Sequence, residues 1–246
     1  MFTAIMFYTR IPVPRSTGFS EENLNKATRY FPLMGIVVGG LGALLFFLAN
    51  LAMGVHLSIL ASLILMIMVT GAFHEDGLAD FCDGFGGGYT SERILEIMKD
   101  SRIGVYGGIA LILLFLSKLF LLSEIGLEDI PIVILAAHAF SRLNPVLMIY
   151  TSSYVSPEEG SKSKPVGMKG SIVTLLLAIV FSLAPMFFVS WPIIPFLILA
   201  QLLILFLFRF YVRKMIGGYT GDILGALQQF SEIGFYLTFL IVKNFI

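Results

Sequence analysis

The sequence predicts an all-α protein, a polytopic bundle of about seven membrane-spanning helices in a single domain over residues 1–246. Two observations predict this fold class. Hydrophobic residues make up 57% of the chain and charged residues only 13%, and the mean hydropathy is +0.92. Uncharged stretches of about 20 residues, each long enough to cross roughly 30 Å of hydrocarbon, recur along the chain. The formal net charge is zero and gives no indication of a nucleic-acid partner. The expected partner is the lipid bilayer, because of these apolar stretches.

Residues 1–32 are expected to lie at the membrane interface, ahead of the first span. Pro12 and Pro14 disfavour a continuous helix there, because proline lacks an N–H and clashes with the preceding turn. Ser20 is followed by two glutamates, which is the pattern of a helix N-cap and an acidic first turn. The polar helix that this pattern predicts is expected on the surface.

Seven apolar stretches follow, and each is expected to form a span. Gly35 and Gly39 in the first stretch form a G-x-x-x-G pattern, which allows two helices to pack closely. Residues 171–208 are too long for one span, and Pro185 and Pro192 divide them into two. The expected spans cover about residues 33–55, 57–73, 103–123, 130–151, the two parts of 171–208, and 233–246.

Basic residues alternate with these spans. They precede the first span and follow the second, fourth and sixth, whereas the connections near residue 56, at 124–129 and around Trp191 contain no lysine or arginine. The positive-inside rule therefore places the N-terminus in the cytoplasm. The expected location is the cell inner membrane, with residues 74–102 and 209–232 on the cytoplasmic face. The basic residues of this pattern are Arg10, Arg15, Lys26, Arg29, Arg93, Lys99, Arg102, Lys162, Lys164, Lys169, Arg209, Arg213 and Lys214.

Residues 74–102 form an acidic stretch with the features of a catalytic segment. Asp76, Asp80 and Asp83 are spaced i, i+4 and i+7, so a helix through them places all three carboxylates on one face. Glu75 lies about 100° round the same helix and is expected to close the group from the side. Carboxylates stacked so closely repel one another, and hard oxygen donors suit Mg²⁺ or Mn²⁺. The spacing therefore predicts a divalent metal site at these four residues, with Mg²⁺ as the expected cofactor.

The same stretch offers groups that can bind phosphate. Gly84 begins a glycine cluster whose backbone amides could approach an anion. Lys99, Ser101 and Arg102 add positive charge and hydrogen-bond donors, and Asp100 adds a further carboxylate beside them. Together with the acidic residues, these groups predict a site for a metal ion and a substrate phosphate.

A second polar segment, residues 209–232, returns to the same face of the membrane. Thr220 is a candidate N-cap, and Asp222 and Glu232 then lie on one side of the helix that follows. Two acidic segments on one face predict one shared site. Arg142 lies inside the fourth span, where it either binds a substrate or a carboxylate or packs with its charge directed to the interface.

Four strings in the chain resemble the cobalamin synthase family. They are H-E-D-G-L-A-D-F-C-D-G-F from His74, M-K-D-S-R-I-G-V-Y-G from Met98, F-Y-T-R-I-P-V-P from Phe7 and G-G-Y-T-G-D-I-L-G-A from Gly217. The resemblance covers essentially the whole length. It implies an integral membrane enzyme of late cobalamin assembly that requires Mg²⁺. Such an enzyme joins adenosylcobinamide-GDP to α-ribazole, or to α-ribazole 5′-phosphate, and releases GMP.

The resemblance and the residues together suggest roles within such a site. A metal ion at the acidic residues would neutralise the pyrophosphate, with Asp100 as a further donor. Lys99, Arg102 and Arg142 are expected to stabilise the charge on the departing GMP, and Asp83 or Asp100 is expected to accept the proton of the attacking hydroxyl. Substrate contacts are expected from His74, Gly84, Ser101, Arg142, Thr220, Asp222 and Glu232.

Two other functions fit parts of the sequence. Asp80-Phe-Cys-Asp83-Gly84 is similar to the D-x-x-D-G core of CDP-alcohol phosphotransferases, although the Ala-Arg that follows in that family is absent. An ion-coupled transporter would also place acids beside broken helices, but nearer the middle of the bilayer. Turnover of a cytidine-activated lipid would favour the first alternative, and substrate flux into liposomes would favour the second.

Overall fold

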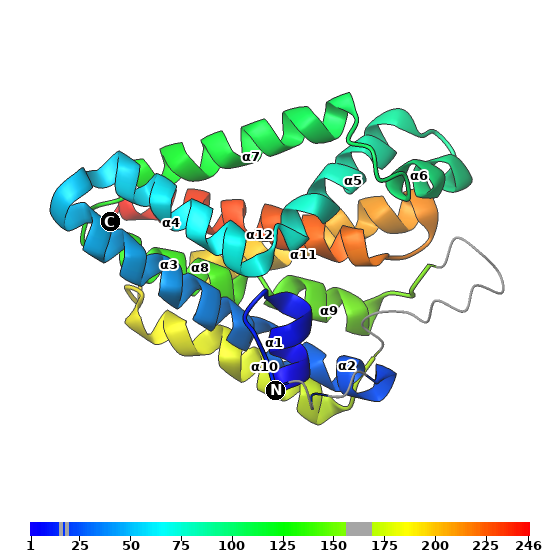
Figure 1. The fold of residues 1–246 in the computed structure, drawn as a ribbon, viewed down its shortest axis with the longest axis horizontal. Helices are drawn as coiled ribbons and strands as arrows, with labels where there is room; N and C mark the ends of the chain where they lie inside the picture. The colour runs from blue at the N-terminus through cyan, green and yellow to red at the C-terminus, as the bar shows by residue number, and fades with distance from the viewer. Residues whose placement is uncertain (15–16, 18–19, 156–168) are drawn as a thin grey trace.

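The computed structural model describes residues 1–14, 17, 20–155 and 169–246, and helices make up most of these ranges (Figure 1). Within them no strand is present, and the extended pairing is one isolated parallel bridge between Tyr154 and Tyr219. The prediction of an all-α protein is therefore confirmed. Outside the described residues lie Arg15, Lys162 and Lys164 of the charge pattern and the side chains of the two glutamates after Ser20.

Within the described ranges, four helical segments are long and apolar enough to cross a membrane, and there are five if one bent pair of helices is taken as a span. The bent pair is α4 (Val55–Thr70) with α5 (Phe73–Gly87). These segments agree with a multi-pass membrane protein. The four are α3 (Phe31–Met53) with the residues that lead into it, α7 (Val105–Ser123), α8 (Ile130–Phe140) together with α9 (Leu143–Thr151), and α11 (Ile194–Ile216).

Two of the expected spans take a different form. The stretch that starts at residue 171 forms α10 (Ile172–Leu183) and a short 3₁₀ helix, η2 (Ala184–Phe188), which includes Pro185. The last expected span is the C-terminal part of α12 (Gly221–Lys243), which begins within the second polar segment. Because Thr220 caps α12 and no proline follows, polar and apolar residues continue in one helix.

The chain turns by 88° between α4 and α5, so α5 does not continue the apolar helix before it. Gly71 and Ala72 both take left-handed conformations at this turn, with φ of 69° and 59°. Glycine adopts this conformation without steric cost, which allows α4 to end at Thr70. The turn directs α5 alongside α7 and α12, at the right of Figure 1, where α6 (Ser91–Met98) also lies.

The N-terminal residues fold onto the bundle. α1 (Phe2–Tyr8) buries Ala4 and Tyr8 against the start of α3. The backbone N–H of Arg10 donates to the carbonyl of Val69 at 2.7 Å and ties the segment to α4. Ser20 caps α2 (Glu21–Ala27) as predicted, since its hydroxyl accepts an N–H from the first turn at 3.2 Å.

α3 and α8 pack closely because two glycines of α3 lie at their contact. A Cβ atom at Gly35 would collide with the backbone carbonyl of His138, and one at Gly39 would lie 2.8 Å from the Cβ of His138. The close helix packing predicted from G-x-x-x-G is thus confirmed. A Cβ at Gly40 would instead make an ordinary 3.8 Å contact with Leu135.

A buried apolar cluster fixes the orientation of α5. Leu78 and Phe81 of α5 pack with Ile94 of α6 and with Ile223 and Leu227 of α12. Full burial of such a side chain stabilises the fold by about 1.5–3 kcal/mol. Since these contacts fix the rotation of α5 about its axis, they also fix the direction of its acidic side chains.

Gly35→Ala is expected to lower the free energy of unfolding in detergent by about 1–3 kcal/mol, because the added methyl group overpacks the α3–α8 contact. Gly40→Ala adds the same group where space is available, so it should keep stability or raise it by up to about 1 kcal/mol, the helix-propensity difference between glycine and alanine. Thermal unfolding of the two purified variants measures the difference. Equal midpoints for Gly35→Ala and the wild type would contradict the tight contact described here.

Candidate active site

The three predicted aspartates lie on one face of α5. The helix runs from Phe73 to Gly87 and contains Asp76, Asp80 and Asp83 at the spacing that the sequence predicts. Asp76 is exposed, Asp80 is half-buried and Asp83 is buried. This acidic face therefore becomes more enclosed toward the C-terminal end of the helix.

A fourth carboxylate, Asp222, comes from the start of α12. Thr220 caps this helix as predicted, because its hydroxyl accepts an N–H of the first turn at 3.4 Å. α12 crosses α5 so closely that a Cβ at Gly77 would lie 2.7 Å from the carbonyl oxygen of Asp222. Nearby, a Cβ at Gly225 would lie 3.3 Å from the carbonyl oxygen of His74. The crossing places Asp222 beside the acidic face of α5.

The carboxylates of this face repel one another. Asp80 experiences the charge of Asp222 most strongly, followed by the charges of Asp76 and Asp83. Burial raises the pKa of Asp222, and the carboxylate of Asp76 raises it further. A divalent cation would relieve this repulsion, and all four side chains offer the hard oxygen donors that Mg²⁺ prefers. Among the described residues, no group of three or more Asp, Glu, His or Cys side chains is arranged to hold a metal ion.

Asp83 anchors α5 to the start of α7. One carboxylate oxygen accepts the N–H of Gly104 at 2.7 Å, and the other accepts the N–H of Gly107 at 2.9 Å. N–H groups at a helix start have no carbonyl partner within the helix, and negative charge is favoured there. Both glycines leave room for the carboxylate, because a Cβ at either would collide with it.

Asp100 and Arg102 form an ion pair on the loop between α6 and α7. The guanidinium of Arg102 donates to both oxygens of Asp100, with Nη2 and Oδ2 separated by 2.6 Å, and these hydrogen bonds hold the pKa of Asp100 at about 2. Lys99 and Ser101, on either side of Asp100, are exposed. The pair lines an open cavity of about 710 Å³ between α5, α6 and α7, and Asp83 lies in the wall of the same cavity. Arg102 and Asp100 thus share a cavity with Asp83 of the acidic face, whereas Lys99 and Ser101 do not line it.

The glycine cluster of residues 84–88 lies largely within α5, so most of its backbone amides are not free to approach an anion as predicted. Gly84 and Gly86 lie in the last turns of α5, where backbone N–H groups point along the helix axis and are not presented to a ligand. The two glycines make room for neighbouring side chains. A Cβ at Gly84 would collide with Met98, and one at Gly86 would lie 2.6 Å from the ring of Tyr106.

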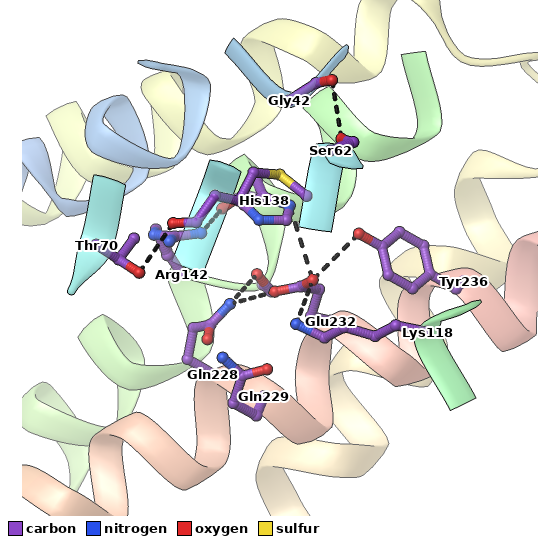
Figure 2. A network of polar contacts seen from close by, with 12 residues as sticks. Gly42, Ser62, Thr70, Lys118, His138, Arg142, Gln228, Gln229, Glu232 and Tyr236 are labelled. Carbon is purple, nitrogen blue, oxygen red and sulfur yellow. Dashed lines mark hydrogen bonds and ion pairs between the residues drawn. The ribbon is translucent and has the colours of Figure 1, made fainter. Parts of the chain in front are cut away.

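Glu232 is the centre of a buried polar network deep in the bundle (Figure 2). Its carboxylate pairs with Lys118 of α7 at 2.7 Å and accepts hydrogen bonds from Tyr236 and Gln228 at 3.1 and 2.9 Å. Only 1% of Glu232 is exposed. A buried charge needs such partners, and this carboxylate finds them inside the protein.

Arg142, Glu75 and His74 approach the same network and lie away from the acidic face. Arg142 is buried, donates to a backbone carbonyl of α8 at 2.6 Å, and lies 5.5 Å from the ring centre of Phe31, so its charge is enclosed within the protein. The ring of His74 stacks on Phe31. Glu75 accepts a hydrogen bond from Gln229 of α12 at 3.1 Å. The structure thus separates Glu75 from Asp76 and Asp80, with which the sequence spacing had grouped it.

Tyr154 belongs to the surroundings of the acidic face, although no motif indicated it. It pairs with Tyr219 in the parallel bridge, where the N–H of Val155 donates to the carbonyl of Tyr219 at 2.9 Å. Burial raises the pKa of Tyr154, and the nearby carboxylate of Asp222 raises it further. No local pattern could indicate this contact, because it depends on the return of the chain at the start of α12.

Comparison with known proteins places the whole chain among one set of relatives. A family model described as cobalamin-5-phosphate synthase matches residues 1–240. A Vibrio cholerae protein named adenosylcobinamide-GDP ribazoletransferase is 44% identical over 238 residues, which cover 96% of this chain and 91% of that protein. Proteins of the same name from Shewanella baltica and Shewanella frigidimarina are 42% identical over 245 residues, covering 98% of this chain and 93% and 94% of their own lengths. No solved structure matches the chain.

Asp83→Asn is expected to destabilise the protein even without substrate or metal. The amide of asparagine has only one good acceptor, so one N–H at the start of α7 loses its partner at a cost of about 1–3 kcal/mol. Asp76→Asn is the matched control, because it removes an exposed carboxylate from a group of like charges and should leave stability unchanged or raised. Thermal unfolding of both metal-free variants makes the comparison. The anchoring role of Asp83 would be refuted if Asp76→Asn lost stability and Asp83→Asn did not.

Proposed function

The chain belongs to the cobalamin-5-phosphate synthase family, and we propose on this basis that it transfers the adenosylcobinamide phosphate group of adenosylcobinamide-GDP to α-ribazole or α-ribazole 5′-phosphate. In this reaction a ribose hydroxyl oxygen bonds to the phosphorus that carries adenosylcobinamide, and the anhydride bond to GMP breaks. The reaction is the ribazole-transfer step at the end of cobalamin assembly. The observation that carries the proposal is the family match over residues 1–240, together with 44% identity to a ribazoletransferase.

The acidic face is the proposed metal site. Asp76, Asp80 and Asp222 would supply the donors, because their carboxylates act on one another at the crossing of α5 and α12. Glu75 is left out of this group, since its carboxylate accepts a hydrogen bond from Gln229 inside the bundle. Mg²⁺ bound at this face would supply positive charge that offsets the negative charge of the substrate pyrophosphate.

The cavity between α5, α6 and α7 is the proposed site of the guanosine phosphate. Its volume of about 710 Å³ is within the range of roughly 300–1,000 Å³ typical of ligand sites. Arg93 and Arg102 line it and would stabilise charge on the departing GMP. Lys99 and Ser101 are exposed nearby and offer further donors. Because Asp83 is part of the cavity wall, the nucleotide would lie next to the acidic face.

The proton of the attacking hydroxyl is proposed to pass to Asp80 or Asp222. Asp83 accepts two backbone hydrogen bonds, and Asp100 has a pKa of about 2 because of its hydrogen bonds from Arg102. Both oxygens of Asp83 are therefore already engaged, and Asp100 is a weak base near neutral pH. Asp80 and Asp222 belong to the acidic face, and whichever of the two is not bound to the metal is proposed as the acceptor.

The bundle is further proposed to cross the inner membrane seven times, with the N-terminus and the acidic face in the cytoplasm. α10 with η2, and the C-terminal part of α12, would add two spans to the five apolar segments. The described part of the alternating charge pattern supports this orientation. Arg93 of α6 and Arg213 near the end of α11 belong to elements that lie at the same end of the bundle as α5 (Figure 1).

Purified protein in liposomes is expected to release GMP from adenosylcobinamide-GDP when α-ribazole and Mg²⁺ are present, and to stop when EDTA removes the metal. Asp80→Asn should lower the rate by about 100-fold or more, because it removes the carboxylate at the centre of the acidic face. Glu128→Gln is the control, since it removes an exposed carboxylate from the connection between α7 and α8 and should keep the full rate.

The products of the same assay separate the alternatives. Release of CMP from a cytidine-activated lipid, with no GMP release, would support a CDP-alcohol phosphotransferase. Accumulation of substrate inside the liposomes without GMP release would support a transporter. A fully active Asp80→Asn variant would remove the acidic face from the mechanism and leave the reaction itself in place.

A further inference from the structure

A cavity the size of one water molecule lies inside the bundle, beside the polar network of Figure 2. Its volume is about 10 Å³, which is roughly the room that a single water needs. Side chains from α4, α5, α7, α8 and α12 and the residue that precedes α9 enclose it. The polar residues on its wall are Thr70, His74, Glu75, Lys118, His138, Arg142, Gln229 and Glu232, most of them drawn in Figure 2.

Several buried polar atoms on this wall have no hydrogen-bond partner in the protein. An unpaired buried group costs about 1–3 kcal/mol, and folded proteins rarely keep several of them together. A buried water makes about three hydrogen bonds, so one water could satisfy most of the group. The atoms are His74 Nε2, Glu75 Oε2, His138 Nδ1, Arg142 Nε and Gln229 Oε1.

The charges on the wall favour a neutral occupant. Lys118 and Arg142 are balanced by Glu75 and Glu232, and Lys118 and Glu232 are in direct contact at 2.7 Å. An added metal ion or anion would leave an uncompensated charge in a buried site, which is costly. Water adds no charge and provides both donors and acceptors.

The same wall connects the two helices that carry the acidic face. Glu75 directly precedes Asp76 on α5, and Gln229 lies about two turns after Asp222 on α12. The amide nitrogen of Gln229 donates to Glu75 Oε1 at 3.1 Å. The remaining oxygen of each side chain is among the unpaired atoms, so a water in the cavity would complete this link between the helices.

We infer that the cavity holds one ordered water, which joins Glu75 to Gln229 in addition to their direct hydrogen bond. These two residues are positioning residues that hold Asp76 beside Asp222. The inference rests on the proposed metal site at Asp76, Asp80 and Asp222. Glu75 then acts through its neighbour Asp76 and does not bind the metal. Without the link, α5 and α12 keep their glycine contact but lose the polar contact that fixes their register.

Binding of Mn²⁺, followed by electron paramagnetic resonance, tests the positioning role without turnover. Gln229→Leu removes the hydrogen bond to Glu75 and should weaken Mn²⁺ binding about 10-fold. Gln201→Leu is the matched control: Gln201 is also buried and donates to the carbonyl of Ser231 on α12 at 2.7 Å, in a separate polar group with Asn144. Both variants should lose stability, and only Gln229→Leu should lose Mn²⁺ affinity.

Glu75→Gln separates positioning from direct coordination. Glutamine keeps two hydrogen-bonding atoms at this place, so Mn²⁺ affinity should stay within about threefold of wild type, whereas loss of a metal ligand should exceed about 10-fold. An experimental density map that resolves internal waters should show one within hydrogen-bond distance of Glu75 and Gln229, at about 2.7–3.2 Å.

Three results would overturn the inference while leaving the metal site in place. Two are equal Mn²⁺ affinity in Gln229→Leu and wild type, and a loss of Mn²⁺ affinity beyond about 10-fold in Glu75→Gln. The third is a cavity without water in a density map that shows other buried waters. Wild-type protein that binds no Mn²⁺ would instead overturn the proposed metal site, and the positioning role with it. The two failures are therefore distinguishable.

Discussion

The close crossing of α5 and α12 is the contact on which the rest of the site depends. At Gly77 the carbonyl of Asp222 stands where a side chain would otherwise be, so the two backbones touch. Only this approach brings Asp222 into one face with Asp76 and Asp80, which come from a helix far away in the sequence. The apolar cluster of α5, α6 and α12 holds the crossing from one side, and the hydrogen bond between Glu75 and Gln229 holds it from another.

The charged residues inside the bundle and those on the acidic face have opposite surroundings. Inside the bundle Glu232 is paired with Lys118, and both side chains are almost fully buried. Because an unpaired charge in such surroundings is costly, these partners are structural necessities. On the acidic face the carboxylates meet one another and not cations. Such an arrangement costs stability unless a cation or a substrate binds to it. Groups of this kind are typical of functional sites.

Local features of the sequence were predictable, and features that depend on tertiary contacts were not. The spacing of Asp76, Asp80 and Asp83 and the cap at Thr220 are properties of single helices, so both predictions hold in the structure. The turn before α5 was not predictable, since it needs Ala72 in a left-handed conformation. The glycines whose amides were expected to approach an anion lie largely in a helix, because packing against neighbouring side chains outweighs a helix-propensity cost of about 1 kcal/mol per glycine. The separation of Glu75 from Asp76 likewise depends on which helices pack against each side of α5.

The string that resembles CDP-alcohol phosphotransferases shows why a shared motif does not establish a shared site. Its two aspartates do different things here: Asp80 faces the other carboxylates, whereas both oxygens of Asp83 accept N–H groups from the start of α7. The acid that completes the face, Asp222, comes from a different helix and cannot be read from the spacing within the string. The family match is stronger evidence because it extends over residues 1–240 and is not confined to one short string. The proposed metal site rests in turn on the crossing of α5 and α12, and not on the acidic string alone.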